Sequence, residues 1–262
     1  MRAMNFWNVI FLLPIVYLYS PYNYHIEKSN TKWLETFRSD FSKKEWLFLI
    51  CTGRSGSTTL LNMVNLISPQ LYIRGEILSL TNKLLTIHDS IVKIPYRENG
   101  AYASKFRVEY DEMYPEYRKI LYKTLGHMYD KNINTVGFKL VSVKTEKQLN
   151  WLNTLFPNAR FIVNWRKNTT EQKKSMVRSK FNAPKHSDPK KWNEQIQSWS
   201  MKQHPDRIFE LPLEEFSVDN FNRLLEWLDY DGCKFLRVVH NNKKTLNFES
   251  TLKVIDGLCI KK

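Results

Sequence analysis

Residues 46–65 read WLFLICTGRSGSTTLLNMVN, and this stretch decides the fold. It opens with six apolar residues, continues with TGRSGSTT at 52–59, and then returns to apolar residues at helical spacing. A strand that ends in small residues and restarts as a helix is typical of an anion site, because a helix N-terminus carries unpaired N–H groups and the positive end of a dipole. Glycines let the backbone wrap the anion, and hydroxyls add donors. The sequence therefore predicts a phosphate-binding loop over Cys51–Thr59, with a plain Ser/Gly turn that caps the helix as the alternative interpretation.

This loop differs from the nucleotide-triphosphatase pattern, GxxxxGKS or GxxxxGKT. Gly53 and Gly56 are too close together, and no Lys precedes Ser57 or Thr58. The cation of the loop comes early instead, at Arg54. We therefore expect a phosphate cradle of a different kind.

Composition narrows the ligand class. The chain has 262 residues and a formal net charge of +14, enough length for one α/β domain and a charge that favours anionic ligands. No segment carries a nucleic-acid motif and the basic residues are spread, so we expect no nucleic-acid partner. The cysteines form no CxxC pair and the histidines are scattered, so we expect no metal. Cys51 is an expected buried thiol, and whether Cys233 and Cys259 pair depends on an oxidising compartment, which the sequence leaves open.

The N-terminal segment Met4–Tyr19 is apolar apart from Asn5 and Asn8. It is long for the apolar core of a signal peptide and short for a full spanning helix of ~20 residues, and no small-residue cleavage site follows it. We expect an uncleaved signal anchor, with a buried core helix as the alternative. Three parts are expected: a membrane anchor at 1–20, a polar stem at 21–44 and a catalytic domain at 45–262. The flanking charges do not settle the orientation of the anchor.

Short apolar runs alternate with amphipathic segments along the rest of the chain. We expect helices over 60–67, 77–87, 113–129, 148–155, 169–179, 192–199 and 219–228, and strands over 46–51, 72–73, 136–141, 160–165 and 208–213. The tail at 233–262 is weakly patterned. This alternation predicts an α/β fold of three layers, a central parallel sheet with helices on both faces. Ligands in such sheets bind beyond the carboxyl ends of strands, where 52–59, Lys139 and Arg166 are expected.

A second anion site is expected at Arg166. This arginine follows the buried strand RFIVNW, and Ser175 lies nine residues later on the next helix, so both side chains can converge on one phosphate. A glycine loop followed by strand–Arg–helix–Ser resembles the sulfotransferases that use 3′-phosphoadenylyl sulfate (PAPS), over roughly residues 46–230. The form RSGST, with Arg where cytosolic members carry Lys, is closer to the Golgi carbohydrate and tyrosylprotein enzymes and to bacterial glycolipid enzymes.

The resemblance implies a P-loop-type fold, PAPS as co-substrate without a metal, and a role for each matching residue. Arg54 stands where the family has its leaving-group cation, and Glu76, in YIRGEILS, stands where related enzymes carry an acidic base. Arg166 and Ser175 would bind the 3′-phosphate. The 5′-phosphosulfate would be bound by Thr52, Gly53, Arg54, Ser55, Gly56, Ser57, Thr58 and Thr59.

Several assignments stay open. Glu76 could instead be a helix-start carboxylate that interacts with its own dipole, and His88 or His127 could then be the base. Lys139 could stabilise the transferring oxygens or be a plain strand-end charge. The resemblance implies a single-pass Golgi membrane enzyme with a lumenal domain that sulfates an acceptor hydroxyl. A carbohydrate is the first choice of acceptor, and a tyrosine or a lipid is the next. The alternatives are a P-loop kinase-like phosphotransferase and a catalytically inactive nucleotide-binding membrane protein.

Overall fold

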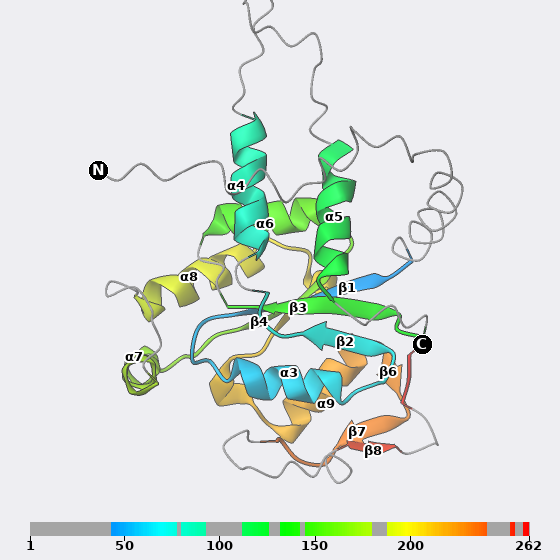
Figure 1. The fold of residues 1–262 in the computed structure, drawn as a ribbon. Helices are drawn as coiled ribbons and strands as arrows, with labels where there is room; N and C mark the ends of the chain where they lie inside the picture. The colour runs from blue at the N-terminus through cyan, green and yellow to red at the C-terminus, as the bar shows by residue number, and fades with distance from the viewer. Residues whose placement is uncertain are drawn as a thin grey trace, which may run out of the picture. The chain divides into compact units, whose positions relative to one another are not determined.

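A five-stranded parallel sheet forms the centre of the fold (Figure 1). The structure is a computed structural model that describes residues 43–77, 80–92, 112–125, 132–141, 145–179, 188–239, 252–254 and 259–261. All of these but Lys43 belong to the compact unit Lys44–Lys262. The strands follow the order β2-β3-β1-β4-β5, and every neighbouring pair is parallel. Their bounds are Glu45–Cys51 for β1, Leu71–Arg74 for β2, Thr135–Leu140 for β3, Arg160–Asn164 for β4 and Ile208–Glu210 for β5. The predicted α/β class and parallel sheet are confirmed.

Helices cover both faces of this sheet (Figure 1). One face carries α3 (Ser57–Asn65) and α9 (Val218–Trp227), and the other carries α4 (Leu80–Val92), α5 (Met113–Lys123), α6 (Glu146–Leu155) and α8 (Pro189–Ser200). Helix α7 (Thr169–Arg178) lies beside α8 (Figure 1).

Side chains of β1 alternate between two apolar cores, as the period of a strand requires. Leu47 and Leu49 belong to the core shared with α3 and α9. Phe48 faces the other way and stacks on Phe161, whose ring centroid is 5.7 Å distant. Trp199 of α8 meets Phe161 edge-on at 5.2 Å, which anchors α8 directly on the sheet.

Several boundaries differ from the sequence-based expectation. Helix α4 begins at Leu80 rather than Ile77. Strand β5 ends at Glu210, two residues before Pro212, which lacks the N–H needed for a ladder. Helix α9 begins at Val218 rather than 219, after Ser217, whose side chain accepts the Asn220 N–H at 3.2 Å.

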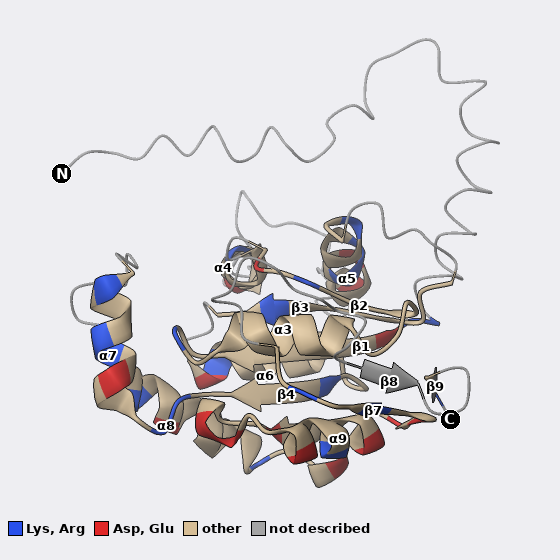
Figure 2. Ribbon diagram, turned by 90° about the horizontal axis from the view of Figure 1, so that it is seen from below, with Lys and Arg blue, Asp and Glu red and all other residues tan. Residues whose placement is uncertain are grey.

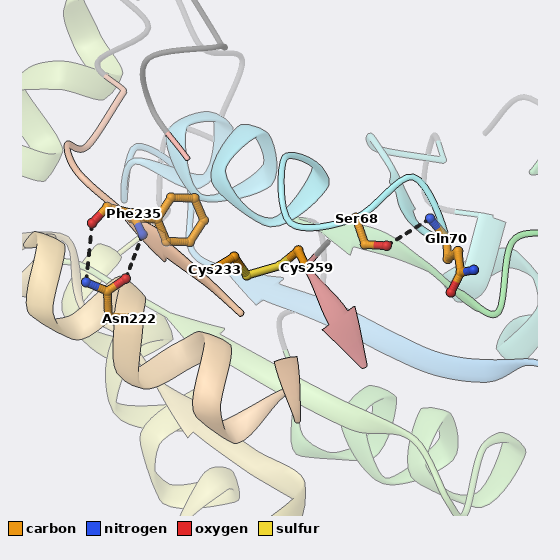
Figure 3. Close-up of a disulfide and its surroundings, with 6 residues drawn as sticks. All are labelled: Ser68, Gln70, Asn222, Cys233, Phe235 and Cys259. Carbon is orange, nitrogen blue, oxygen red and sulfur yellow. Dashed lines mark hydrogen bonds between the residues drawn. A yellow bond between two sulfur atoms is a disulfide. The ribbon is translucent and has the colours of Figure 1, made fainter. Parts of the chain in front are cut away.

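The tail is more ordered than its pattern predicts. Short antiparallel pairs join β6 (Tyr230–Asp231) to β9 (Ile260–Lys261) and β7 (Cys233–Phe235) to β8 (Leu252–Val254). A disulfide links Cys233 to Cys259, whose Cα atoms are 5.0 Å apart (Figure 3). Asn222 of α9 binds both backbone groups of Phe235, at 2.7 and 3.3 Å (Figure 3), so the first hairpin strand is fixed to the core.

The expected membrane anchor cannot be compared with the structure. Met4–Tyr19 and residues 21–42 of the expected stem lie outside the described residues. Among the residues that are described, no helix has both the length and the apolar character required to cross a bilayer.

Candidate functional site

The predicted phosphate loop lies between β1 and α3, at the carboxyl end of the central strand. Two of its residues adopt left-handed backbone conformations, Arg54 at φ 64° and Gly56 at φ 78°. Only glycine adopts this region without strain, and a Cβ at position 56 would also lie 2.5 Å from Cδ1 of Leu213. Gly56 is therefore required both by the turn and by the close approach of Leu213.

The N-terminus of α3 has no side-chain cap. Its N-cap residue is Gly56, which has no side chain to accept a hydrogen bond, and the first turn carries no acidic residue. Helix α5 also lacks a side-chain cap, but its first turn carries Glu116. Helices α6, α7, α8 and α9 are each capped, by Thr145, Asn168, Asp188 and Ser217 respectively. The first-turn N–H groups of α3 are thus left for solvent or for an anion, the arrangement typical of a phosphate site.

The loop is held from beneath by a buried polar cluster. The Ser55 hydroxyl donates to the backbone oxygen of Thr52 at 2.6 Å and also contacts Oδ1 of Asn164. Nδ2 of Asn164 donates to the Leu211 backbone oxygen at 2.8 Å. Ser55 and Asn164 are both fully buried. The Ser55 hydroxyl is thus engaged within the loop, and the expected contact of Ser55 with a phosphate stays a prediction.

The remaining loop hydroxyls divide by exposure. Thr52 is buried, and its Oγ1 accepts a hydrogen bond from Gln172 at 3.0 Å. Thr58 is exposed, and Ser57 and Thr59 are half-buried. Arg54 is exposed as well. The part of the loop that an anion could reach is therefore Arg54 with the first turn of α3.

A second polar chain, missed by sequence reasoning, reaches the loop from the side. Nε2 of Gln172 on α7 donates to the Gly53 backbone oxygen at 2.7 Å as well as to Thr52. Nδ2 of Asn193 on α8 donates to Oε1 of Gln172 at 3.1 Å and to the Arg166 backbone oxygen at 2.7 Å. No sequence signal identifies these two residues, because Gln and Asn on amphipathic helices are ordinary surface residues.

The two predicted anion sites adjoin each other. Nε of Arg54 donates to Oγ of Ser175 at 3.0 Å, so the loop cation meets the serine that was expected beside the second phosphate. Arg166 follows β4, the neighbour of β1, and is half-buried. The structure brings together Arg54 and Ser175 by direct contact, and Arg166 with the loop through Asn193 and Gln172.

Glu214 orders the segment after β4. Its carboxylate accepts the backbone N–H groups of Lys167 and Asn168 at 2.8 and 3.0 Å, and one oxygen lies 3.8 Å from Nε of Arg166. Partial burial alone would raise the pKa of Glu214, but the two backbone donors and the Arg166 charge outweigh it, and the pKa lies below its usual value.

Glu76 and Lys139 form an ion pair at the ends of β2 and β3. Nζ of Lys139 lies 3.3 Å from Oε1 of Glu76, and the lysine side chain is 9% exposed whereas the glutamate is 54% exposed. Glu76 lies four residues before the first residue of α4, so it is not a carboxylate of that helix's first turn. Burial raises the pKa of the neighbouring Cys51 thiol to about 12, although the Lys139 charge opposes the shift, so Cys51 stays a neutral thiol.

Of the two histidines offered as alternative bases, the structure describes His88 alone. His88 is buried on α4 and packs against the rings of Tyr114 and Tyr117 of α5, at 5.5 and 5.8 Å between centroids. His127 lies outside the described residues. Within the described part of the chain no group of three or more His, Cys, Asp or Glu residues could hold a metal ion, and the expected absence of a metal remains a prediction.

Comparisons with known proteins give similar folds only. No protein-family profile matches the chain, and no curated protein matches it. Among solved structures, a sulfotransferase from Alicyclobacillus acidocaldarius is 14% identical, with 70% of this chain and 80% of that one covered at a TM-score of 0.42. The sulfotransferase domain of the Synechococcus PCC 7002 olefin synthase is 15% identical, with 71% of this chain and 74% of that one covered at a TM-score of 0.45. A sugar kinase from a Janibacter species is 15% identical, with 71% of this chain and 95% of that one covered at a TM-score of 0.38.

Glu214 gives a prediction with a defined pH dependence. Because its folded pKa is lowered, its carboxylate stabilises the fold above the unfolded pKa, near 4.5, and this contribution is lost as pH falls through the folded pKa. The native chain should be more stable than Glu214→Gln. This difference in free energy of unfolding should be largest near neutral pH and should shrink below about pH 4.5. Urea unfolding over a pH series measures it.

The matched control is Glu215→Gln, which removes the adjacent carboxylate that contacts the exposed Lys167 ammonium. Its effect on stability should be small, as for most exposed ion pairs. A Glu214→Gln difference that stays constant from neutral to acidic pH would contradict the proposed role of the carboxylate.

Proposed function

We propose that this chain is a PAPS-dependent sulfotransferase, which transfers a sulfuryl group to an acceptor hydroxyl. One observation carries the proposal: the hydrogen bond of 3.0 Å between Arg54 and Ser175. It joins the loop that would bind the 5′-phosphosulfate to the helix that would bind the 3′-phosphate. One nucleotide with phosphates at both positions would thus find two cationic sites side by side.

The residues fit a nucleotide that carries two separate anionic groups. The uncapped N-terminus of α3 offers backbone donors to the 5′ group. Nε of Arg166 is buried and makes no hydrogen bond in the described structure, so it retains a donor for a phosphate oxygen. Basic residues also lie on α7 (Figure 2), at Lys173, Lys174 and Arg178, of which the last two pair with Glu171 of the same helix. These charges favour the approach of an anion over that of a neutral nucleoside.

The proposed reaction is an in-line transfer. The bond between sulfur and the bridging phosphate oxygen breaks, and a bond between sulfur and the acceptor oxygen forms. Arg54 would compensate the charge that develops on the leaving phosphate. Glu76 would accept the proton of the acceptor hydroxyl. Lys139 would hold the exposed Glu76 carboxylate in place through the 3.3 Å ion pair.

The rival assignment, a P-loop kinase-like phosphotransferase, requires a lysine at the end of the loop. Gly56 is instead followed by Ser57, and the loop cation is Arg54. We therefore prefer sulfuryl transfer, with a carbohydrate hydroxyl as the first acceptor to test and tyrosine or a lipid alcohol next.

Nucleotide selectivity tests the cofactor assignment. Adenosine 3′,5′-bisphosphate should raise the melting temperature much more than AMP, since a ligand at about 100 times its Kd stabilises the fold by roughly 2.7 kcal/mol. Arg166→Ala should remove most of the difference between the two nucleotides. Arg223→Ala, on the exposed face of α9, is the control and should preserve it. Equal shifts from both nucleotides in the native chain would refute the assignment.

Glu76→Gln tests the base. The change keeps the size of the side chain but removes the proton acceptor, so single-turnover sulfuryl transfer should slow by about 10²–10⁴. Affinity for the bisphosphate should hardly change, because Glu76 would face the acceptor. Glu226→Gln, on the exposed face of α9, should leave the rate unaltered. Normal transfer in Glu76→Gln would exclude Glu76, and nucleotide binding without turnover in the native chain would favour the inactive alternative.

We further propose that the enzyme is a single-pass Golgi membrane protein with a lumenal catalytic domain, anchored by Met4–Tyr19. The Cys233–Cys259 disulfide supports an oxidising compartment. The full chain should remain in membranes after carbonate washing, and both cysteines should resist alkylation until they are reduced. Release by carbonate, or free thiols at both positions in freshly isolated membranes, would overturn this placement.

A further inference from the structure

A chain of buried amides connects the two anion-binding regions. It consists of Gln172 on α7 and Asn193 on α8, here called the amide brace. Gln172 is fully buried and Asn193 is 3% exposed. The brace begins at the Arg166 backbone oxygen, passes through Asn193 and Gln172, and ends on Thr52 and Gly53 of the loop.

The polarity of the brace is fixed by its partners. Nε2 of Gln172 donates to two oxygens of the loop, and its Oε1 accepts from Asn193. Nδ2 of Asn193 likewise faces two acceptors, Oε1 of Gln172 and the Arg166 oxygen. A flipped amide would place oxygen against oxygen at either residue. Each side chain therefore has one orientation, and the distance that they span is defined.

The brace connects the loop and the Arg166 segment beyond the end of the β1–β4 ladder. The register of β1 with β4 ends at Cys51 opposite Asn164, and one further backbone bond joins Thr52 to Asn164 at 3.0 Å. Beyond this point the loop and the Arg166 segment leave the ladder. Side chains must then fix their separation, and those of the brace reach both segments.

The composition of the brace also indicates a role beyond stability. Oδ1 of Asn193 is buried and has no hydrogen-bond partner in the described structure. An unpaired buried acceptor is unfavourable, and an apolar residue of similar shape would avoid it. An amide at this position suits a residue whose donors are needed to position the Arg166 backbone.

We propose that Gln172 and Asn193 are positioning residues that set the spacing between the loop and Arg166, and so select nucleotides phosphorylated at both the 5′ and the 3′ position. The proposal rests on the proposed function. A ligand that bridges two sites makes its second contact with little further loss of conformational entropy only when the sites are already spaced to match it. Without the brace each site could still bind a phosphate, but one rigid nucleotide would no longer fit both equally well.

The experiment compares dissociation constants of adenosine 3′,5′-bisphosphate and AMP, by calorimetry on the full chain in detergent. The readout is the ratio of the AMP constant to the bisphosphate constant. Gln172→Met keeps the volume but removes the bonds, and it should lower this ratio roughly tenfold, the loss expected when one 1.4 kcal/mol advantage disappears. Gln195→Met, the same substitution on α8 two residues from Asn193, is the control and should leave the ratio unchanged.

A second variant keeps the test decisive if Gln172→Met does not fold. Asn193→Ser removes the bridging amide while the loop contacts of Gln172 remain, and it should also lower the ratio. Equal weakening of both nucleotides, an unchanged ratio, or loss of folding in both variants would overturn the proposal and make the brace purely structural. A native chain that does not prefer the bisphosphate would refute the proposed function itself, which is a distinguishable result.

Discussion

The site depends on the point where β1 and β4 stop pairing, at Cys51 and Asn164. Backbone groups beyond a buried ladder must find other partners, because an unpaired buried N–H or C=O is costly. Here the partners are side chains: Asn164 and Ser55 below the loop, and Gln172 beside it. They fix the loop without using the first turn of α3, whose donors remain for a ligand.

Carboxylates in this site position cations without neutralising them. Both oxygens of Glu214 accept backbone N–H groups, so its interaction with Arg166 is a longer contact of 3.8 Å. The Glu214 charge thus positions the Arg166 guanidinium, while the Nε–H of Arg166 makes no hydrogen bond in the described structure. The Lys139–Glu76 pair is asymmetric in burial, with the lysine enclosed and the carboxylate at the surface. An exposed carboxylate held by a buried lysine suits a group that must meet an incoming acceptor.

Sequence reasoning succeeded where local pattern and chain topology act together. The apolar runs of β1 and β4 predicted buried parallel strands, and parallel strands place their carboxyl ends at one edge, which brings Arg54 near Ser175. It could not find Gln172 or Asn193, because a buried amide is recognised only from partners distant in sequence. It also missed the hairpins of the tail, whose strands of two or three residues are too short to show a period.

The backbone of Arg54 indicates that its side chain is needed. A non-glycine residue in the left-handed region costs roughly 1–2 kcal/mol, and glycine would remove that cost at this position. Arginine nevertheless occupies the site, exposed, with φ 64° and its Nε bound to Ser175. Such strain persists where the surrounding structure enforces it, and here Ser55 and Gln172 hold the residues on either side. The loop thus tolerates an unfavourable backbone conformation that presents one guanidinium at the junction of two anion sites. This is expected if the charge contacts a ligand that spans both sites.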